Sequence, residues 1–279
     1  SLGDWLAMGK GIAWQAMHNN PVSNAFIVHD LKVISETAER LGKKADADRY
    51  RRQLEATTKA YIEKFVSKKG IVAKDYQSAY IMALKFVLPE GELRELVKKN
   101  FAANIRKNGL QTGFFATEHL LPLLVEAGET ELAYDILLQE GCPGWMYQIK
   151  CGATTTWERW DALKPDGTVN EEKMAGSGDN MVSFNHYAFG SVGEFYYQYI
   201  LGIKPQKPGF AELHFEPYPD RRLGGVSGSY LSRAGKIESS WKYEEDGCHI
   251  SLNTPVKSEV VLPNGQRETV EEGTYQWLC

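Results

Sequence analysis

The hydrophobic pattern of the chain changes once, near Gly202, and this change constrains the fold more than any other feature. Before Gly202, apolar residues recur every three or four positions, which is typical of amphipathic helices. After a Pro- and Gly-rich stretch at 204–209, short runs alternate apolar and polar residues, as strands with one buried face do. We therefore expect a mainly α part over residues 1–203 and a small all-β domain, an antiparallel β-sandwich, over residues 208–279.

Turn and helix-breaking residues divide the two parts into elements. Gly42 ends a helix that begins at Asn24, and the segments that follow end at Pro, Gly or Asn, which favours antiparallel helical pairs with short loops. In the second part, Asp246-Gly247 and Asn264-Gly265 are hairpin signals. The expected helices are 24–41, 50–65, 77–87, 91–108, 116–127, 129–139 and 185–201, and the expected strands are 211–216, 228–233, 236–243, 248–254, 258–262 and 274–278.

Composition excludes several classes of partner. A net charge of −4 without a basic block gives no reason to expect a nucleic acid or an anionic membrane surface, and no apolar run is long enough for a transmembrane helix. The chain begins Ser-Leu-Gly-Asp-Trp, which is not a signal peptide; we expect it to be part of a longer protein whose location stays open. The cysteines show no CxxC pair and no metal-ligand spacing, so we expect free thiols and neither a metal nor a cofactor; they are Cys142, Cys151, Cys248 and Cys279.

The densest group of chemically versatile residues is Gly152–Asp161, where Trp157 and Trp160 flank Glu158 after three threonines. A carboxylate between two indoles is poorly solvated, which disfavours its charged form and suits it to proton transfer near neutral pH. The indole faces are also suited to stacking on a sugar ring. The alternative interpretation is structural: a threonine-capped helix start with both tryptophans in the core.

Two further stretches combine polar and aromatic residues. Asn185 and His186 stand at the expected start of a helix, where free N–H groups and a polar pair can bind hydroxyl groups. The structural alternative makes Asn185 a helix cap and His186 a hydrogen-bonded core residue. Near the start of the chain, Asp4 can accept hydrogen bonds from two sugar hydroxyls, and Trp5 can stack on a sugar.

Together, these stretches resemble the bacterial α-L-rhamnosidases of glycoside hydrolase family 78. The resemblance is carried by Gly152–Asp161, by Met181–Phe195, by the opening Gly3-Asp4-Trp5 and by the loop Thr112-Gly113-Phe114. It covers nearly the whole chain. It implies that the helical part belongs to an (α/α)6 toroid, and that the parent protein is an inverting hydrolase that removes terminal α-linked L-rhamnose from a glycoside or polysaccharide.

The same resemblance implies a role for each matching residue. Glu158 matches the general base that activates the attacking water, and an inverting enzyme holds that base far enough from its acid for a water to fit between them. Asp4 and Trp5 match a substrate-binding pair, and His186 matches a sugar-contacting histidine. The remaining candidate substrate-binding residues are Asn185, Trp157 and Trp160, and the Thr112–Phe114 loop is expected to line the cleft.

The chain departs from the family pattern in two ways. The family's general acid lies in an Asp/Glu/Arg-rich motif upstream of Gly3-Asp4-Trp5, and this sequence does not contain that motif. We therefore expect the chain to be inactive alone and to need the N-terminal part of the same protein as its partner. The second departure is the link at 163–179, which is longer than usual and is expected to reshape the leaving-group side of the cleft.

Two other interpretations stay open on the sequence. One is another (α/α)6 hydrolase or lyase that acts on a different sugar. The other is a non-catalytic carbohydrate-binding or structural module, because one carboxylate without its partner cannot complete inversion. The sequence does not select the glycoside, the linkage, the aglycone or the oligomeric state.

Overall fold

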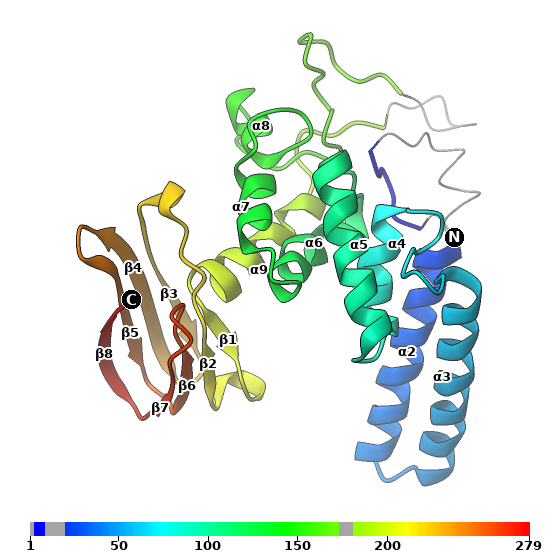
Figure 1. Ribbon diagram of the computed structural model, residues 1–279, viewed down its shortest axis with the longest axis horizontal. Coiled ribbons are helices and arrows are strands. Elements are labelled where there is room, and N and C mark those ends of the chain that lie inside the picture. Colours follow the sequence, from blue (N-terminus) through cyan, green and yellow to red (C-terminus); the bar gives the residue numbers. More distant parts are fainter. Residues whose placement is uncertain (1–2, 9–19, 173–180) are drawn as a thin grey trace. The chain divides into compact units, whose positions relative to one another are not determined.

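The computed structural model describes residues 3–8, 20–172 and 181–279 and divides the chain into two compact units, 1–190 and 191–279 (Figure 1). The boundary between the two units lies earlier in the chain than the change of hydrophobic pattern at Gly202. Residues 191–201 belong to the second unit because strand side chains bond to the end of their helix. The Trp241 indole donates to the Ile200 carbonyl at 2.7 Å, and the Ser239 hydroxyl donates to the Leu201 carbonyl at 2.6 Å.

The described helices of the first unit follow one another through short connections (Figure 1). The first two, α2 and α3, lie side by side, and Gly42 between them has a left-handed φ of 71°, which ends α2 as the sequence predicts. The helices are α2 (Asn20–Arg40), α3 (Lys44–Phe65), α4 (Gln77–Met82), the π-helix η1 (Ala83–Val87), α5 (Glu92–Asn108), α6 (Phe114–Glu126), α7 (Thr130–Leu138) and α8 (Trp145–Lys150).

The core of the first unit gathers around α4 and the start of η1. Residues 76–84 are all buried, which is typical of an internal helix enclosed by its neighbours. Helices α2, α5 and α6 contact α4.

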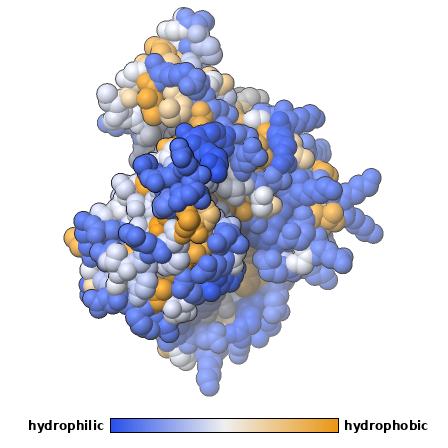
Figure 2. All heavy atoms as spheres, turned by 60° about the vertical axis from the view of Figure 1, so that its left-hand side comes forward, coloured by the Kyte–Doolittle hydropathy of each residue, from blue (hydrophilic) through white to orange (hydrophobic). Residues whose placement is uncertain are grey.

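No described helix is long and apolar enough to cross a bilayer. On the face shown in Figure 2, hydrophilic residues dominate and apolar residues form scattered groups.

The last helical stretch begins later than expected. It consists of η2 (Ala188–Ser191), α9 (Val192–Phe195) and the π-helix η3 (Tyr196–Ile200). Asn185 and His186 therefore lie in the loop before it, and the prediction that they open the helix is wrong. Helix α8 was not predicted from the sequence, because Gly141, Pro143 and Gly144 are typical of a loop.

The second unit contains two four-stranded sheets, with strand orders β1-β2-β6-β7 and β3-β4-β5-β8. Every neighbouring pair is antiparallel except β2 and β6, which are parallel. Side chains such as Phe215, Trp241 and Leu252 are buried. The strands are β1 (Ile203–Pro205), β2 (Leu213–Phe215), β3 (Gly225–Ser232), β4 (Gly235–Glu244), β5 (Gly247–Thr254), β6 (Ser258–Val261), β7 (Arg267–Val270) and β8 (Gly273–Leu278), with the 3-10 turns η4 (Pro208–Phe210) and η5 (Arg221–Leu223) between them.

A histidine–carboxylate cluster in this unit predicts a pH-dependent stability. His214 lies 3.2 Å from Glu216 and 3.1 Å from Glu259. The bond to His214 lowers the pKa of Glu216 from 4.5 to about 2, and the bonds to Glu216 and Glu259 raise the pKa of His214 above 6.5. The glutamate contribution is thus full above pH 4.5 and is lost as the pH falls toward 2. The histidine contribution is full below pH 6.5 and is lost as the pH rises through the raised pKa.

We therefore expect the free energy of unfolding of this unit to gain about 1 kcal/mol from the cluster between roughly pH 4.5 and 6.5. Urea denaturation at pH 3, 5.5 and 9 measures the effect. The His214→Gln variant removes it, whereas His249→Gln, which changes an exposed pair with Asp246, leaves most of it in place. An equal pH dependence in His214→Gln and the unchanged chain contradicts the prediction.

Candidate functional site

The start of helix α6 is held by Asp4. One carboxylate oxygen accepts hydrogen bonds from the Ser78 hydroxyl at 2.5 Å and the Gly113 amide at 2.7 Å. The other accepts from the amides of Phe115 at 2.8 Å and Ala116 at 3.1 Å. These are the free N–H groups at a helix N-terminus, which favour a negative charge. Asp4 is therefore the N-terminal cap of α6, supplied from a distant part of the sequence.

The geometry gives Asp4 a structural role. Its side chain is 0% exposed, and protein donors occupy both of its oxygens. Burial raises the pKa of Asp4, while the four hydrogen bonds offset part of that rise. The described contacts of Asp4 are thus all with the protein, and its contact with a substrate stays a prediction from the sequence.

The Thr112–Phe114 loop, expected to line a cleft, is anchored from several sides. The Trp5 carbonyl accepts a hydrogen bond from the Phe114 amide at 3.0 Å. A side chain on Gly113 would meet the Trp5 carbonyl at 2.2 Å, so only glycine fits at that position. Thr112 is 0% exposed, whereas the Phe114 ring and the Trp5 side chain are half-buried and retain exposed surface. Thr112 itself is thus a core residue.

The two tryptophans of the Glu158 stretch are core residues. Trp160 is 0% exposed: its ring stacks on Phe189 with the centroids 3.8 Å apart, and its indole N–H donates to the Thr112 carbonyl at 2.8 Å. Trp157 is 3% exposed and meets Tyr147 edge to face. Both rings therefore pack against other aromatic side chains, and their contacts with a sugar stay predictions from the sequence. The structural alternative is half right, because the tryptophans are buried but residues 152–162 form turns and not a helix.

The Glu158 and His186 stretches lie side by side. The Glu158 amide donates to the Ser183 carbonyl at 2.8 Å, and the His186 amide donates to the Thr156 carbonyl at 2.8 Å. The hydroxyl of Thr156 also donates to the His186 carbonyl at 2.5 Å. The structure therefore brings together two of the stretches that the sequence singled out.

Glu158 is half-buried, and its carboxylate has no hydrogen bond or ion pair with any residue that the structure describes. Its main chain is fixed by the bond to Ser183 and by its position between two buried tryptophans. A carboxylate that is held in place and yet has unused acceptor sites can receive a proton from a bound water.

The His186 ring contacts two aromatic rings. Its centroid is 4.8 Å from that of Phe114 and 4.9 Å from that of Tyr187. The Ala188 amide donates to Nδ1 at 3.2 Å, so the neutral ring carries its proton on Nε2. Nε2 is then available as a donor to an oxygen ligand. Asn185 next to it is exposed, and its backbone N–H donates to the Ser183 hydroxyl at 3.2 Å.

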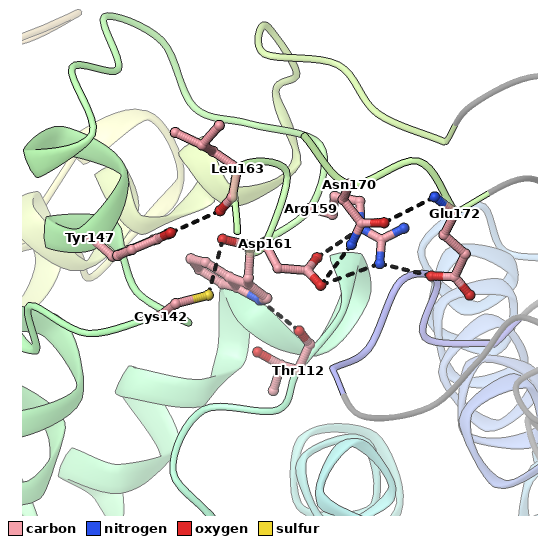
Figure 3. A network of polar contacts seen from close by, with 9 residues as sticks. Thr112, Cys142, Tyr147, Arg159, Asp161, Leu163, Asn170 and Glu172 are labelled. Atoms are coloured by element: carbon pink, nitrogen blue, oxygen red, sulfur yellow. Dashed lines mark hydrogen bonds and ion pairs between the residues drawn. The ribbon is translucent and has the colours of Figure 1, made fainter. Parts of the chain in front are cut away.

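An ionic network that the sequence did not predict surrounds Arg159 (Figure 3). The guanidinium is buried and bonds Asp161 at 2.8 Å and Glu172 at 2.8 Å. Asn170 donates to the same Asp161 carboxylate at 2.9 Å. Burial acts to lower the pKa of Arg159, but the bonds to Asp161 and Glu172 raise it above its usual value. The signal available in the sequence was an arginine two residues before an aspartate inside the densest motif.

This network holds together the described part of the long link that begins at residue 163, after the Glu158 stretch. Asp161 and Glu172 stand at the two ends of a hairpin in which Leu163 pairs with Val169. Arg159, which directly follows Glu158 in the chain, therefore forms ion pairs with both ends of the hairpin. The rest of the predicted insertion, residues 173–179, lies outside the described residues.

Among the residues that the structure describes, no cluster of possible metal ligands includes Glu158. Within the described part of the chain, the one group of three His, Cys or carboxylate side chains close enough to share an ion is Glu244, Asp246 and His249. All three are exposed, and they lie in the second unit at the turn between β4 and β5.

Comparison with known families matches both parts of the chain. Residues 1–200 match the bacterial alpha-L-rhamnosidase 6 hairpin glycosidase domain, and residues 202–276 match the bacterial alpha-L-rhamnosidase C-terminal domain. An alpha-L-rhamnosidase of Alteromonas sp. (strain LOR) is 35% identical over 274 residues, which make up 94% of this chain and 29% of that protein.

Solved structures show the same likeness. Native alpha-L-rhamnosidase from Aspergillus terreus has a TM-score of 0.89 at 29% identity, covering 99% of this chain and 32% of that one. The Streptomyces avermitilis alpha-L-rhamnosidase complexed with L-rhamnose has a TM-score of 0.87 at 30% identity, covering 99% and 28%. The expected fold class, part of an (α/α)6 toroid followed by a β-sandwich, is confirmed. The chain spans about a third or less of the length of each of these proteins.

Proposed function

Because this chain belongs to the bacterial α-L-rhamnosidase family, we propose that it is the C-terminal part of a glycoside hydrolase that removes terminal α-L-rhamnose with inversion of configuration. In this proposal the chain supplies the general base, Glu158. The general acid comes from the N-terminal part of the same protein, so the chain alone is inactive. The substrate class rests on its relatives, which are named α-L-rhamnosidases.

The observation that carries the proposal is the state of Glu158. Its carboxylate is half-buried, fixed through its main chain and without a partner among the described residues. Buried carboxylates that serve only stability are paired, as Asp4 is here with four donors. A held but unpaired carboxylate, in a stretch that is joined by backbone bonds to the stretch of His186, fits a general base better than a structural residue.

Each chemical step then has a group to perform it. Glu158 takes a proton from a water molecule as the water oxygen attacks the anomeric carbon of rhamnose. The bond from that carbon to the leaving oxygen breaks, and the acid of the N-terminal part donates its proton to that oxygen. A separation of about 6.5–9.5 Å between the two carboxyl groups leaves room for the water. The product is β-L-rhamnose.

The sugar-binding set is smaller than the sequence suggested. We assign the contacts to His186, whose Nε2–H donates to a hydroxyl, to the exposed Asn185 and to Trp5, which retains exposed surface. Asp4, Trp157 and Trp160 support these residues from the core and do not touch the sugar. The Phe114 ring, packed on His186, fixes the direction of that donor.

The stereochemistry of the product tests the proposal. Proton NMR of an aryl α-L-rhamnoside digest, recorded before the anomers equilibrate, is expected to show β-L-rhamnose first when the enzyme contains both this chain and the N-terminal part. The chain alone is expected to be at least about 10²-fold slower. An α product excludes inversion. Rapid turnover by the chain alone places the acid within it. Rhamnose binding without cleavage by the complete protein favours the non-catalytic module instead.

A further inference from the structure

Two of the four free cysteines lie opposite each other on neighbouring strands of one sheet of the second unit. The Cys248 amide donates to the Cys279 carbonyl at 2.8 Å, and the Cys279 amide donates to the Cys248 carbonyl at 3.0 Å. This double exchange continues the β5–β8 register, in which Ile250 pairs with Trp277 and His249 with Leu278. Cys248 and Cys279 are therefore a directly opposed pair in an antiparallel ladder.

Opposed residues of an antiparallel pair project from the same face of the sheet. Cys248 shares the buried face of β5 with Ile250 and Leu252, so both thiols lie on that face. Their α carbons are separated by about 5.5 Å in such a pair, which is within the range that a disulfide bridges. Burial first, and then the proximity of Cys279, raises the pKa of Cys248.

We propose that Cys248 and Cys279 form a reversible disulfide that joins β8 to β5 when the protein meets a disulfide oxidant. The structure holds the reduced form. This proposal is independent of the glycosidase function, because it uses no residue of the candidate site.

The chemistry is thiol–disulfide exchange with a small-molecule disulfide. Cys279 reacts first because it is half-buried, whereas Cys248 is 3% exposed. The Cys279 thiolate attacks one sulfur of the oxidant, which forms a mixed disulfide and releases one small thiol. The Cys248 thiolate then attacks the Cys279 sulfur and releases the second small thiol. In total, two protein thiols are oxidised, one oxidant disulfide is reduced, and the two thiol protons end on the released thiols.

The position in the sheet gives the link a physical effect. Strand β8 is an edge strand that pairs only with β5 within its sheet, so its end is the least supported part of that ladder. A hydrogen-bonded pair holds its β carbons farther apart than a relaxed disulfide prefers. The link is therefore expected to be strained and easily reduced, as labile disulfides are, and to stabilise β8 only under oxidising conditions.

Titration of the intact chain in glutathione redox buffers tests the proposal. As the oxidised fraction rises, the four free thiols are expected to fall to two, and non-reducing peptide mass spectrometry is expected to join the peptides of Cys248 and Cys279. The thermal midpoint of the second unit is expected to rise by about 5 °C or more. Dithiothreitol is expected to reverse both changes.

Matched variants separate this pair from the other cysteines. Cys279→Ser, at a half-buried position, is expected to abolish both the thiol loss and the thermal shift. Cys142→Ser, which leaves the proposed pair intact, is expected to retain both. Four thiols at every buffer ratio, a link between Cys142 and Cys151, a link between two chains, or a mixed disulfide at Cys279 that never resolves would each overturn the proposal.

Discussion

Replacing Glu158 by glutamine in the complete enzyme is expected to lower kcat for rhamnose release by about 10²–10⁴-fold while KM changes little. Glutamine has nearly the same shape as glutamate but cannot accept the proton of the attacking water. The main chain of residue 158 keeps its hydrogen bond to Ser183, so the fold of the stretch is preserved. Steady-state kinetics on an aryl α-L-rhamnoside measure the effect.

Two further variants make this experiment specific. Glu36→Gln, at an exposed position of α2, removes a charge of the same kind and is expected to leave kcat unchanged. Glu158→Ala is expected to lose activity and to regain part of it in azide, because that anion attacks without losing a proton. Unchanged turnover in Glu158→Gln, or an equal loss of rate and of rhamnose binding, would remove Glu158 from the role of base.

Periodicity and turn residues together predicted most of the elements. Every helix expected in the first unit is present, and each of the six expected strands is found, with ends that differ by a few residues. The missed strands β1 and β7 lie at the two edges of one sheet. An edge strand tolerates the proline at position 205 and the polar run Arg267–Thr269, so neither strand carries the alternation on which a sequence-based assignment relies.

The sequence predicted which residues belong to the candidate site better than it predicted the role of each one. The sequence placed Glu158 and His186 in distinct stretches, and the structure joins these stretches by backbone bonds. It could not show that Trp160 turns inward, because a tryptophan suits a core and a sugar site equally well. The stacking partner that decides the matter, Phe189, lies 29 residues further along the chain, beyond the reach of any local pattern.

The role of Asp4 was hidden for the same reason. An N-terminal cap is normally recognised just before its helix, but here the cap precedes α6 by more than 100 residues. At the expected cap position stands Gly113, which has no side-chain acceptor and no room for one. Only the folded chain shows that the aspartate and the glycine form one feature.

Replacing Asp4 by alanine is therefore expected to destabilise the first unit by about 3 kcal/mol or more. The change leaves three backbone amides at the start of α6 and the Ser78 hydroxyl without their acceptor. Each buried donor left unpaired costs about 1–3 kcal/mol, and neighbouring losses are not additive. Hydrogen exchange of the Phe115 and Ala116 amides is expected to accelerate by about 10²-fold or more, since each 1.4 kcal/mol of stability is about tenfold in the opening equilibrium.

Ser78→Ala is the matched control because it removes one of the four donors and leaves the carboxylate in place. It is expected to cost about 1 kcal/mol and to leave the exchange of Phe115 and Ala116 within about tenfold of the unchanged chain. The two assignments for Asp4 give opposite patterns. A cap loses stability and amide protection together, and activity of the complete enzyme falls only as the loop around Gly113 is disturbed. A direct sugar ligand keeps stability and protection and loses rhamnose affinity, so a stable Asp4→Ala variant with intact protection and no rhamnose binding would restore the role that the sequence suggested.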